Sequence, residues 1–246
     1  MKVIPRDQHA ISHKDISDNA LNVIGSLSSR GHETYLVGGA VRDLLLGKIP
    51  KDFDVATSAT PEEIRKIFRR ARIVGRRFRI AHIRCGKEVI EVTTFRGHQQ
   101  RSCQEELAFE EFRHSSRGLL LRDNVFGTMA EDAARRDLTV NALYYDPKSF
   151  SVIDHTGGLD DLSEAKIKVI GDPYTRFIED PVRILRVIRF ATKLNFKIAS
   201  NTASAIPEIS PFLTDIPPAR LFDEFIKLFF SGNAENILRN IINHSL

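Results

Sequence analysis

The chain has 246 residues, of which 42% are hydrophobic, so it can hold one large domain or one domain plus part of another. This composition excludes a chain that is disordered throughout, and no apolar run approaches the length of a transmembrane helix. Lysine and arginine number 36 against 32 acidic residues, and the net charge of +4 fits a polyanionic partner without requiring one. Two cysteines without metal-ligand spacing and a polar N-terminus lead us to expect a soluble, cytoplasmic protein with free thiols.

The first elements expected along the chain are a helix, a strand and a glycine turn. Ser17 is a typical N-cap and predicts the start of the helix, and an apolar strand should follow over 35–37. Gly38 and Gly39 come next, and a short amphipathic helix then ends at Gly47. The backbone N–H groups of such a glycine turn can hold phosphate oxygens.

A second strand should return from this turn with Asp52 and Asp54 one residue apart. Side chains at i and i+2 of a strand lie on the same face, so we expect the two carboxylates side by side. Two carboxylates beside a phosphate cradle predict Mg²⁺-assisted chemistry on a nucleotide.

The next helix should begin at the Thr60 cap with Pro61 in its first turn. It opens a stretch over 65–79 that is rich in arginine and contains no acid. The stretch can be a solvated helix face or a phosphate-contacting stripe, and the sequence leaves both interpretations open. Its basic residues are Arg65, Lys66, Arg69, Arg70, Arg72, Arg76, Arg77 and Arg79.

Two strands joined by a short turn are expected over 79–84 and 88–95. Glu91 is a lone carboxylate in the second of them. It is either an exposed position on an edge strand or the third acid of the metal site, and the latter requires its strand to lie beside that of Asp52 and Asp54.

A dense charged block over 131–143 predicts a further helix. On that helix Asp137 and Asn141 would share one face at i and i+4, with Arg135 and Arg136 directly before them. A charged run of this kind is also typical of a solvated surface, and the block by itself does not distinguish the two interpretations.

The segments around this block set the expected domain organisation. Residues 98–118 are polar without a clear period and are expected to form a long loop, whereas 150–153 and 167–170 should be strands. The composition changes at Gly171 to helices without strands. We therefore expect an α+β domain over 1–171 and a helical region over 172–246.

The helical region contains a row of arginines. Asp180 is a natural N-cap and Pro181 a natural first residue of a helix. Arg183, Arg186 and Arg189 recur at every third residue, so their row drifts slowly around that helix while apolar residues fill the buried side.

The order and spacing of these segments resemble the class II nucleotidyltransferases, the family of bacterial poly(A) polymerases and tRNA CCA-adding enzymes within the DNA polymerase β superfamily. The similarity extends from about residue 10 to the end of the chain. The segments that carry the resemblance are 36–43, 51–55, 131–143, 154–158 and 179–190.

Within this family, further segments resemble the poly(A) polymerase branch. Ala40 departs slightly, since that position is often glycine in the branch and alanine in CCA-adding enzymes. One residue weighs less than four segments, which are 9–12, 75–79, 121–127 and 216–222.

The resemblance implies a polymerase-β-like nucleotidyltransferase head with a mixed β-sheet, followed by an all-helical neck and the start of a body. It implies that Asp52 and Asp54 bind two Mg²⁺ ions, that Glu91 completes the carboxylate cluster and that Asp137 belongs to the active site. The residues implied to bind nucleotide are Gly38, Gly39, Arg42, Arg135, Arg136, Asn141, Asp180, Arg183, Arg186 and Arg189.

The resemblance also suggests how a base is chosen. In this family the pair matching Asp180 and Arg183 acts as a stand-in for a base-pairing partner, in which the carboxylate accepts from an exocyclic amino group and the guanidinium donates to a ring nitrogen. Adenine and cytosine both present that combination, so the pair cannot decide between ATP and CTP. An N-cap aspartate and a surface arginine are the structural alternative.

The expected function is template-independent addition of AMP from ATP to RNA 3′ ends, with release of pyrophosphate. The alternatives are CCA addition to tRNA and a catalytically silent nucleotide- or RNA-binding remnant. Family members continue with further helices, so the chain is expected to be either a fragment or a naturally short protein. A monomer is preferred, although the sequence leaves the oligomeric state open.

Overall fold

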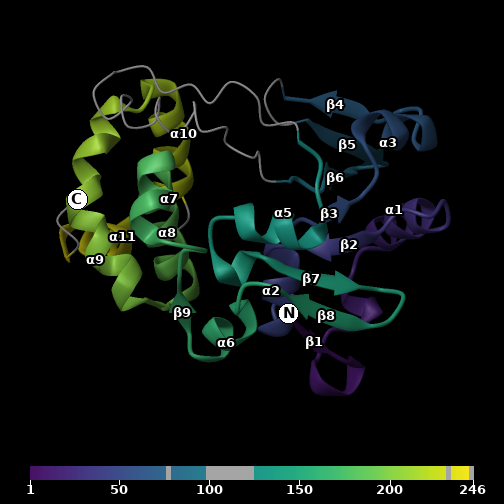
Figure 1. Cartoon of the computed structure of the whole chain (residues 1–246), viewed down its shortest axis with the longest axis horizontal. Coiled ribbons are helices and arrows are strands. Elements are labelled where there is room, and N and C mark those ends of the chain that lie inside the picture. The colour runs from purple at the N-terminus through teal and green to yellow at the C-terminus, as the bar shows by residue number, and fades with distance from the viewer. Residues whose placement is uncertain (76–78, 98–124, 231–233, 244–246) are drawn as a thin grey trace, which may run out of the picture. The chain divides into compact units, whose positions relative to one another are not determined.

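The computed structural model describes residues 1–75, 79–97, 125–230 and 234–243 (Figure 1). Contacts between Cα atoms divide the chain into two compact units. The strand unit comprises residues 2–135 and 144–153, and the helical unit comprises residues 1, 136–143 and 154–246. The expected boundary at residue 171 does not coincide with the limits of these two units, and it stays a prediction.

The strand unit is built on an eight-stranded mixed sheet in the order β1-β8-β7-β2-β3-β6-β5-β4. Strands β3 and β6 pair in parallel, and β2 pairs antiparallel with both β3 and β7. This confirms the expected mixed sheet. The strands are β1 Lys2–Ile4, β2 Thr34–Val37, β3 Asp54–Thr57, β4 Arg72–Val74, β5 Ile80–Cys85, β6 Glu88–Thr94, β7 Leu143–Asp146 and β8 Ser151–Asp154.

Four α-helices of the strand unit are described, besides the short 3₁₀ turns η1 Arg6–Gln8 and η2 His13–Asp15, and local signals place their ends. Ser17 caps the first by accepting a hydrogen bond from the Asn19 N–H, and Thr60 and Glu63 form a reciprocal capping box at the third. These starts confirm the sequence predictions. The helices are α1 Asp18–Ser28, α2 Gly39–Leu45, α3 Pro61–Ile67 and α5 Met129–Arg135.

Apolar side chains cover both faces of the central strands. On one face Val37, Ala56 and Phe95 pack with Ala133 of α5 and with Tyr144 in a buried cluster. The alternate residues of β2, β3 and β6 point to the other face, which α1 covers, because side chains alternate along a strand. Figure 1 shows β2, β3 and β6 adjacent in this unit.

The helical unit is organised around α8, which contacts α7, α10 and α11. A two-stranded parallel sheet of β9 and β10 lies beside it. Strand β10 shows that the prediction of helices without strands after Gly171 is wrong. The elements are the 3₁₀ turn η3 Thr139–Asn141, α6 Gly158–Ser163, β9 Lys166–Ile167, α7 Pro173–Glu179, α8 Val182–Leu194, β10 Lys197–Ile198, α9 Ser200–Ile209, the 3₁₀ turn η4 Ser210–Asp215, α10 Pro218–Phe229 and α11 Ala234–Asn243.

The prediction of one helix over 131–143 is correct up to Arg135 and wrong beyond it. Helix α5 ends at Arg135; Arg136 and Asp137 then form a bend, and Leu138 is extended in a β-bridge with Val169, because the backbone groups of this segment bond elsewhere. The Ile170 N–H donates to the Asp137 carbonyl at 3.1 Å, and the Thr139 N–H donates to the Lys168 carbonyl at 3.0 Å. The expected strand over 167–170 is correspondingly short, since its later residues pair with this segment rather than with the main sheet.

Helix α8 has Pro181 at its N-cap position, so the prediction that Asp180 caps it is wrong; Asp180 follows the last residue of α7. The loop expected over 98–118 lies outside the described residues. Among the helices that the structure describes, none is long and apolar enough to cross a membrane.

Candidate functional site

The glycine turn and the aspartate pair meet at one end of the central strands. Strand register places Val37, the last residue of β2, opposite Asp54, the first residue of β3. Gly38 therefore leaves the sheet beside Asp54. The antiparallel register explains the placement, because β2 ends where β3 begins.

Asp52 lies before β3, so the prediction that both aspartates share one strand is wrong. The ladder between the two strands stops at Asp54 because β2 has already turned into Gly38. Asp52 is exposed, Phe53 between them is buried, and Asp54 is partly buried. The two carboxylates are thus close in sequence, with one on the strand and one in the segment that leads into it.

Gly38 adopts a backbone conformation that favours glycine, with φ of 76° and ψ of −130°, and α2 starts directly after it. A Cβ on Gly39 would lie 3.6 Å from Nη2 of Arg42. Arg42 is buried, with 2% of its side chain exposed, and its guanidinium contacts the Asp43 carboxylate at 2.7 and 2.8 Å. The turn therefore combines backbone N–H groups at the start of a helix with a buried guanidinium.

Glu91 is the register partner of Asp54 in the parallel β3–β6 pair, so the structure meets the condition on which its role as a third acid depended. Its carboxylate lies 3.4 Å from His82 Nε2, across the β5–β6 ladder. Within the ranges that the structure describes, no three His, Cys, Asp or Glu side chains form a group that could hold a metal ion. A role for Glu91 as third metal ligand stays a prediction.

The donor chemistry nevertheless suits Mg²⁺. Asp52 and Asp54 offer hard carboxylate oxygens, and Asp54 begins its strand beside the glycine turn. Magnesium is commonly held by one or two carboxylates together with substrate phosphates and water. Two aspartates, one of them beside the glycine turn, therefore fit this ion without a third acid.

Arg135 ends α5, and its Nη1 donates to the Gly97 carbonyl. Nearby, Asp132 is buried and accepts from Tyr144 Oη at 2.7 Å and from the Arg96 N–H at 3.3 Å. Sequence analysis did not single out Asp132. The signal available was an acid on the apolar face of the short helix, which is unusual unless the acid is paired.

The helical unit holds a second group of the predicted residues, centred on Asp137. Its Oδ2 accepts from Nε of Arg186 at 2.6 Å, and its Oδ1 accepts from the Leu138 N–H at 2.8 Å. Burial alone would raise the pKa of Asp137, but the Arg186 charge and these hydrogen bonds outweigh it and hold that pKa below its usual range. Asn141 is also buried, in η3 rather than one helical turn along.

A glycine motif packs against η3. The buried Asp154 carboxylate accepts from the N–H groups of Thr156, Gly157 and Leu159 at 2.9, 3.0 and 2.9 Å. A Cβ on Gly158 would lie only 2.2 Å from the Thr139 carbonyl oxygen. Only glycine allows this approach, so the motif fixes the segment that contains Asp137 and Asn141.

Arg136 and Arg183 are joined through residues that sequence analysis missed. Nη2 of Arg176 donates to the Arg136 carbonyl at 2.7 Å. Glu179 accepts from Arg176 at 3.0 Å and from Arg183 at 3.1 Å. Burial and the charge of Arg183 lower the pKa of Arg176. The i+3 and i+4 spacing of the three charged residues was the signal in the sequence.

In the part of the chain that the structure describes, the side chains of Asp180 and Arg183 form hydrogen bonds to third residues and not to each other. Oδ2 of Asp180 accepts from Arg220 at 2.6 Å, whereas its Oδ1 is buried and has no hydrogen-bond partner among the described residues. Arg183 also donates to the Arg176 carbonyl at 2.6 Å. Arg189, one turn beyond Arg186 in α8, lies 3.9 Å from Glu224.

The predicted site residues fall into two groups, and each unit contains one. The strand unit holds Gly38, Gly39, Arg42, Asp52, Asp54, Glu91 and Arg135. The helical unit holds Arg136, Asp137, Asn141, Asp180, Arg183, Arg186 and Arg189.

Comparison with known proteins adds family evidence. Residues 34–168 match the family described as the poly A polymerase head domain, and residues 195–246 match one described as a probable RNA and SrmB-binding site of polymerase A. A poly(A) polymerase I from Salmonella typhi is 57% identical over 95% of this chain and 50% of its own length. A CCA-adding enzyme from Enterococcus faecalis is 38% identical over 91% of this chain and 52% of its own length.

Solved structures agree at the level of fold. The crystal structure of the Bacillus stearothermophilus CCA-adding enzyme in complex with CTP aligns with a TM-score of 0.75 and 32% identity, over 91% of this chain and 51% of that one. The chain thus spans about half the length of the relatives it matches.

Proposed function

We propose, from the premise that this chain belongs to the poly A polymerase head-domain family, that it adds AMP from ATP to RNA 3′ ends. Family membership confirms the resemblance drawn from the sequence. The observation that carries the proposal is the register of β2 and β3, which sets the Gly38 turn beside Asp54. Nucleotidyl transfer needs such a pairing, because carboxylates and phosphate-binding donors must act on one triphosphate.

Asp52 and Asp54 would hold two Mg²⁺ ions in this proposal. When bound, these ions would activate the RNA 3′-hydroxyl and neutralise the triphosphate and the leaving pyrophosphate. The N–H groups after Gly38 and the buried Arg42 guanidinium would orient the phosphates. In this arrangement the negatively charged aspartates would face the metal ions, and the backbone N–H groups and the Arg42 guanidinium would face the phosphates.

Asp137, Arg136 and Asn141 would orient the ribose and phosphates of the nucleotide. Arg186 fixes the Asp137 carboxylate at 2.6 Å and keeps it ionised, so Asp137 would act from a preset position. The Gly158 contact holds the backbone of the same segment. Positioning of this kind lowers the cost of orienting the substrate during reaction.

Asp180 and Arg183 would recognise the base. Oδ1 of Asp180 lacks a partner among the described residues, so it would have the acceptor capacity for an exocyclic amino group once the base displaces what covers it. Arg183 would donate to the ring nitrogen beside it. This arrangement suits adenine and cytosine alike, and the preference for ATP rests on the higher identity to relatives named poly(A) polymerase I.

The experiment offers ATP and CTP separately, with Mg²⁺, to an unstructured RNA primer and to a tRNA that lacks its CCA end. We expect long A tails on the primer. Addition of two C residues and one A to the tRNA alone would replace the proposal by CCA addition. Binding of ATP without any product would favour a catalytically silent remnant.

A further inference from the structure

One cavity of the strand unit lies away from the residues used so far. It has a volume of about 280 Å³ and opens between α1, the end of α3 and the end of β5. Ile83, which lines it, alternates along β5 with His82, the neighbour of Glu91. Successive side chains of a strand point to opposite faces, so the cavity lies on the face of the sheet opposite Asp54 and Glu91.

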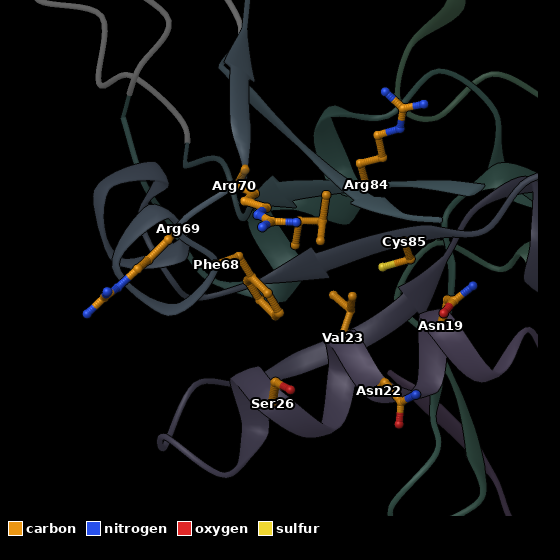
Figure 2. A pocket seen from close by; sticks show the side chains of 11 residues that line it. Asn19, Asn22, Val23, Ser26, Phe68, Arg69, Arg70, Arg84 and Cys85 are labelled. Carbon is orange, nitrogen blue, oxygen red and sulfur yellow. The ribbon is translucent and has the colours of Figure 1, made fainter. Parts of the chain in front are cut away.

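The floor of the cavity is apolar and contains one aromatic ring. Val23, Ala71 and Ile83 are buried, and Phe68 is partly exposed. Figure 2 shows the Phe68 ring and Val23 close together at the floor. A partly exposed ring over an apolar floor offers a stacking surface of about the size that one nucleic-acid base needs.

The rim is cationic. Arg69, Arg70 and Arg84 line it, and all three are exposed. In Figure 2 the Arg69 and Arg84 side chains extend outward on different sides of the cavity. Among described residues neither Arg69 nor Arg70 forms an ion pair, whereas Arg79 of the same stretch is paired with Glu62 at 2.5 Å.

Helix α1 forms one wall of the cavity and supplies polar groups. Asn19, Asn22 and Ser26 of α1 face the cavity. Asn19 is held by donating to Glu88 at 2.7 Å, so this wall is fixed relative to the β5–β6 turn. Amide and hydroxyl groups of this kind can bond to base edges or to ribose.

We propose that this cavity binds one nucleotide of single-stranded RNA, with its base against Phe68 and its flanking phosphates on Arg69, Arg70 and Arg84. The arrangement is that of a sequence-tolerant single-strand site, in which aromatic stacking and a cationic rim act together. The open rim with arginines on different sides favours a continuing chain over a free nucleotide. The inference deepens the proposed function and rests on it for the identity of the RNA substrate.

The test measures binding of a fluorescent single-stranded RNA of about 15 nucleotides by anisotropy, using the whole chain without ATP or Mg²⁺. The salt concentration is varied between about 50 and 200 mM, so that the slope of log Kd against log salt counts phosphate contacts. We expect the double variant Arg69→Ala/Arg70→Ala to bind roughly tenfold more weakly at the lower salt and to lose about 1.4 from the slope, at about 0.7 for each contact.

Two variants separate stacking and charge. Phe68→Leu keeps an apolar side chain and should weaken binding roughly tenfold while the slope stays unchanged. The control Lys14→Ala/Lys148→Ala removes two exposed positive charges of the same unit that do not line the cavity, and it should leave the slope unchanged. Equal slopes for the Arg69/Arg70 variant and this control would overturn the inference.

The source of the phosphate and the proposed function are tested separately. Competition by AMP as strong as that by an equal concentration of unlabelled RNA, lost in the Arg69/Arg70 variant, would overturn the RNA assignment in favour of a free nucleotide. If the wild-type chain extends primers but the Arg69/Arg70 variant has the same salt slope as the wild type, only this inference is contradicted. If the wild-type chain extends no primer but the salt slope of RNA binding is smaller in the Arg69/Arg70 variant, only the proposed function is contradicted.

Discussion

The aspartates of the two units differ in how they are held. Asp137 in the helical unit is 13% exposed, and Arg186 holds it at 2.6 Å. Asp52 in the strand unit is exposed and precedes its strand, and Asp54 starts that strand beside a glycine turn. A carboxylate neutralised by arginine can position other groups, whereas carboxylates grouped beside phosphate donors can hold a cation. The difference supports our proposal that Asp137 positions the nucleotide and that the aspartates of the strand unit hold the metal.

The largest expected effect comes from Asp54→Ala. If the strand unit holds the metal, loss of this carboxylate should reduce nucleotide incorporation by about 10³-fold or more, because the ions supply several kcal/mol of transition-state stabilisation. The thermal midpoint should stay close to that of the wild type, since Asp54 is only partly buried. The control Asp15→Ala removes an exposed acid of the same unit and should leave activity unchanged. Survival of activity in Asp54→Ala would show that the metal assignment is wrong.

The next effect concerns the backbone that carries Asp137. Gly158→Ala should destabilise the fold by about 3 kcal/mol, because its Cβ would lie 2.2 Å from the Thr139 carbonyl oxygen. Gly157→Ala is the matched control. Its φ is +82° and its Cβ would meet no atom within 4 Å, so it should cost only about 1 kcal/mol. Urea unfolding measures both, and equal costs would contradict the close approach.

The Asp137–Arg186 pair predicts a dependence of stability on pH. Asp137→Asn should lower the free energy of unfolding at pH 7 by about 2 kcal/mol, a figure reduced for the one-third exposure of Arg186. The folded-state pKa of Asp137 is lowered, so its stabilisation is fully present above the unfolded-state pKa of about 3.9. It is lost as the pH falls through the folded-state value. The free energy of unfolding, measured with urea, should therefore differ less between wild type and variant below about pH 4. A difference that stays constant with pH would contradict the ion pair.

Glu91→Gln gives the smallest effect and sharpens the comparison within the strand unit. If two aspartates suffice to hold the metal, this change should lower incorporation by about tenfold at most, which is about 1.4 kcal/mol. Its carboxylate is 47% exposed and lies beside His82, so the fold should tolerate the amide. A loss as large as that of Asp54→Ala, measured in the same primer assay, would instead place Glu91 among the metal ligands.

Local signals in the sequence predicted much of the strand unit. The Ser17 and Thr60 caps start helices α1 and α3, and Gly38 takes the positive φ that its turn requires. These features depend on a few neighbouring residues, so they can be read from short segments of sequence. The family resemblance, carried by the order of several motifs, went further and predicted the fold class, which is confirmed, and a set of site residues, which stays a prediction.

Tertiary structure decided what depends on distant partners. The helix predicted over 131–143 stops at Arg135 because Lys168 and Ile170 bond to the backbone of Thr139 and Asp137, on either side of a bridge between Leu138 and Val169. The partners of Asp137 and Asp180 are Arg186 and Arg220, 49 and 40 residues along the chain. The parallel neighbour of β3 is β6, which local periodicity cannot choose. The sequence by itself thus determined caps, turns and the identities of the chemical groups, whereas pairing between distant segments determined where helices end and which charges meet, because those choices depend on contacts that no short window contains.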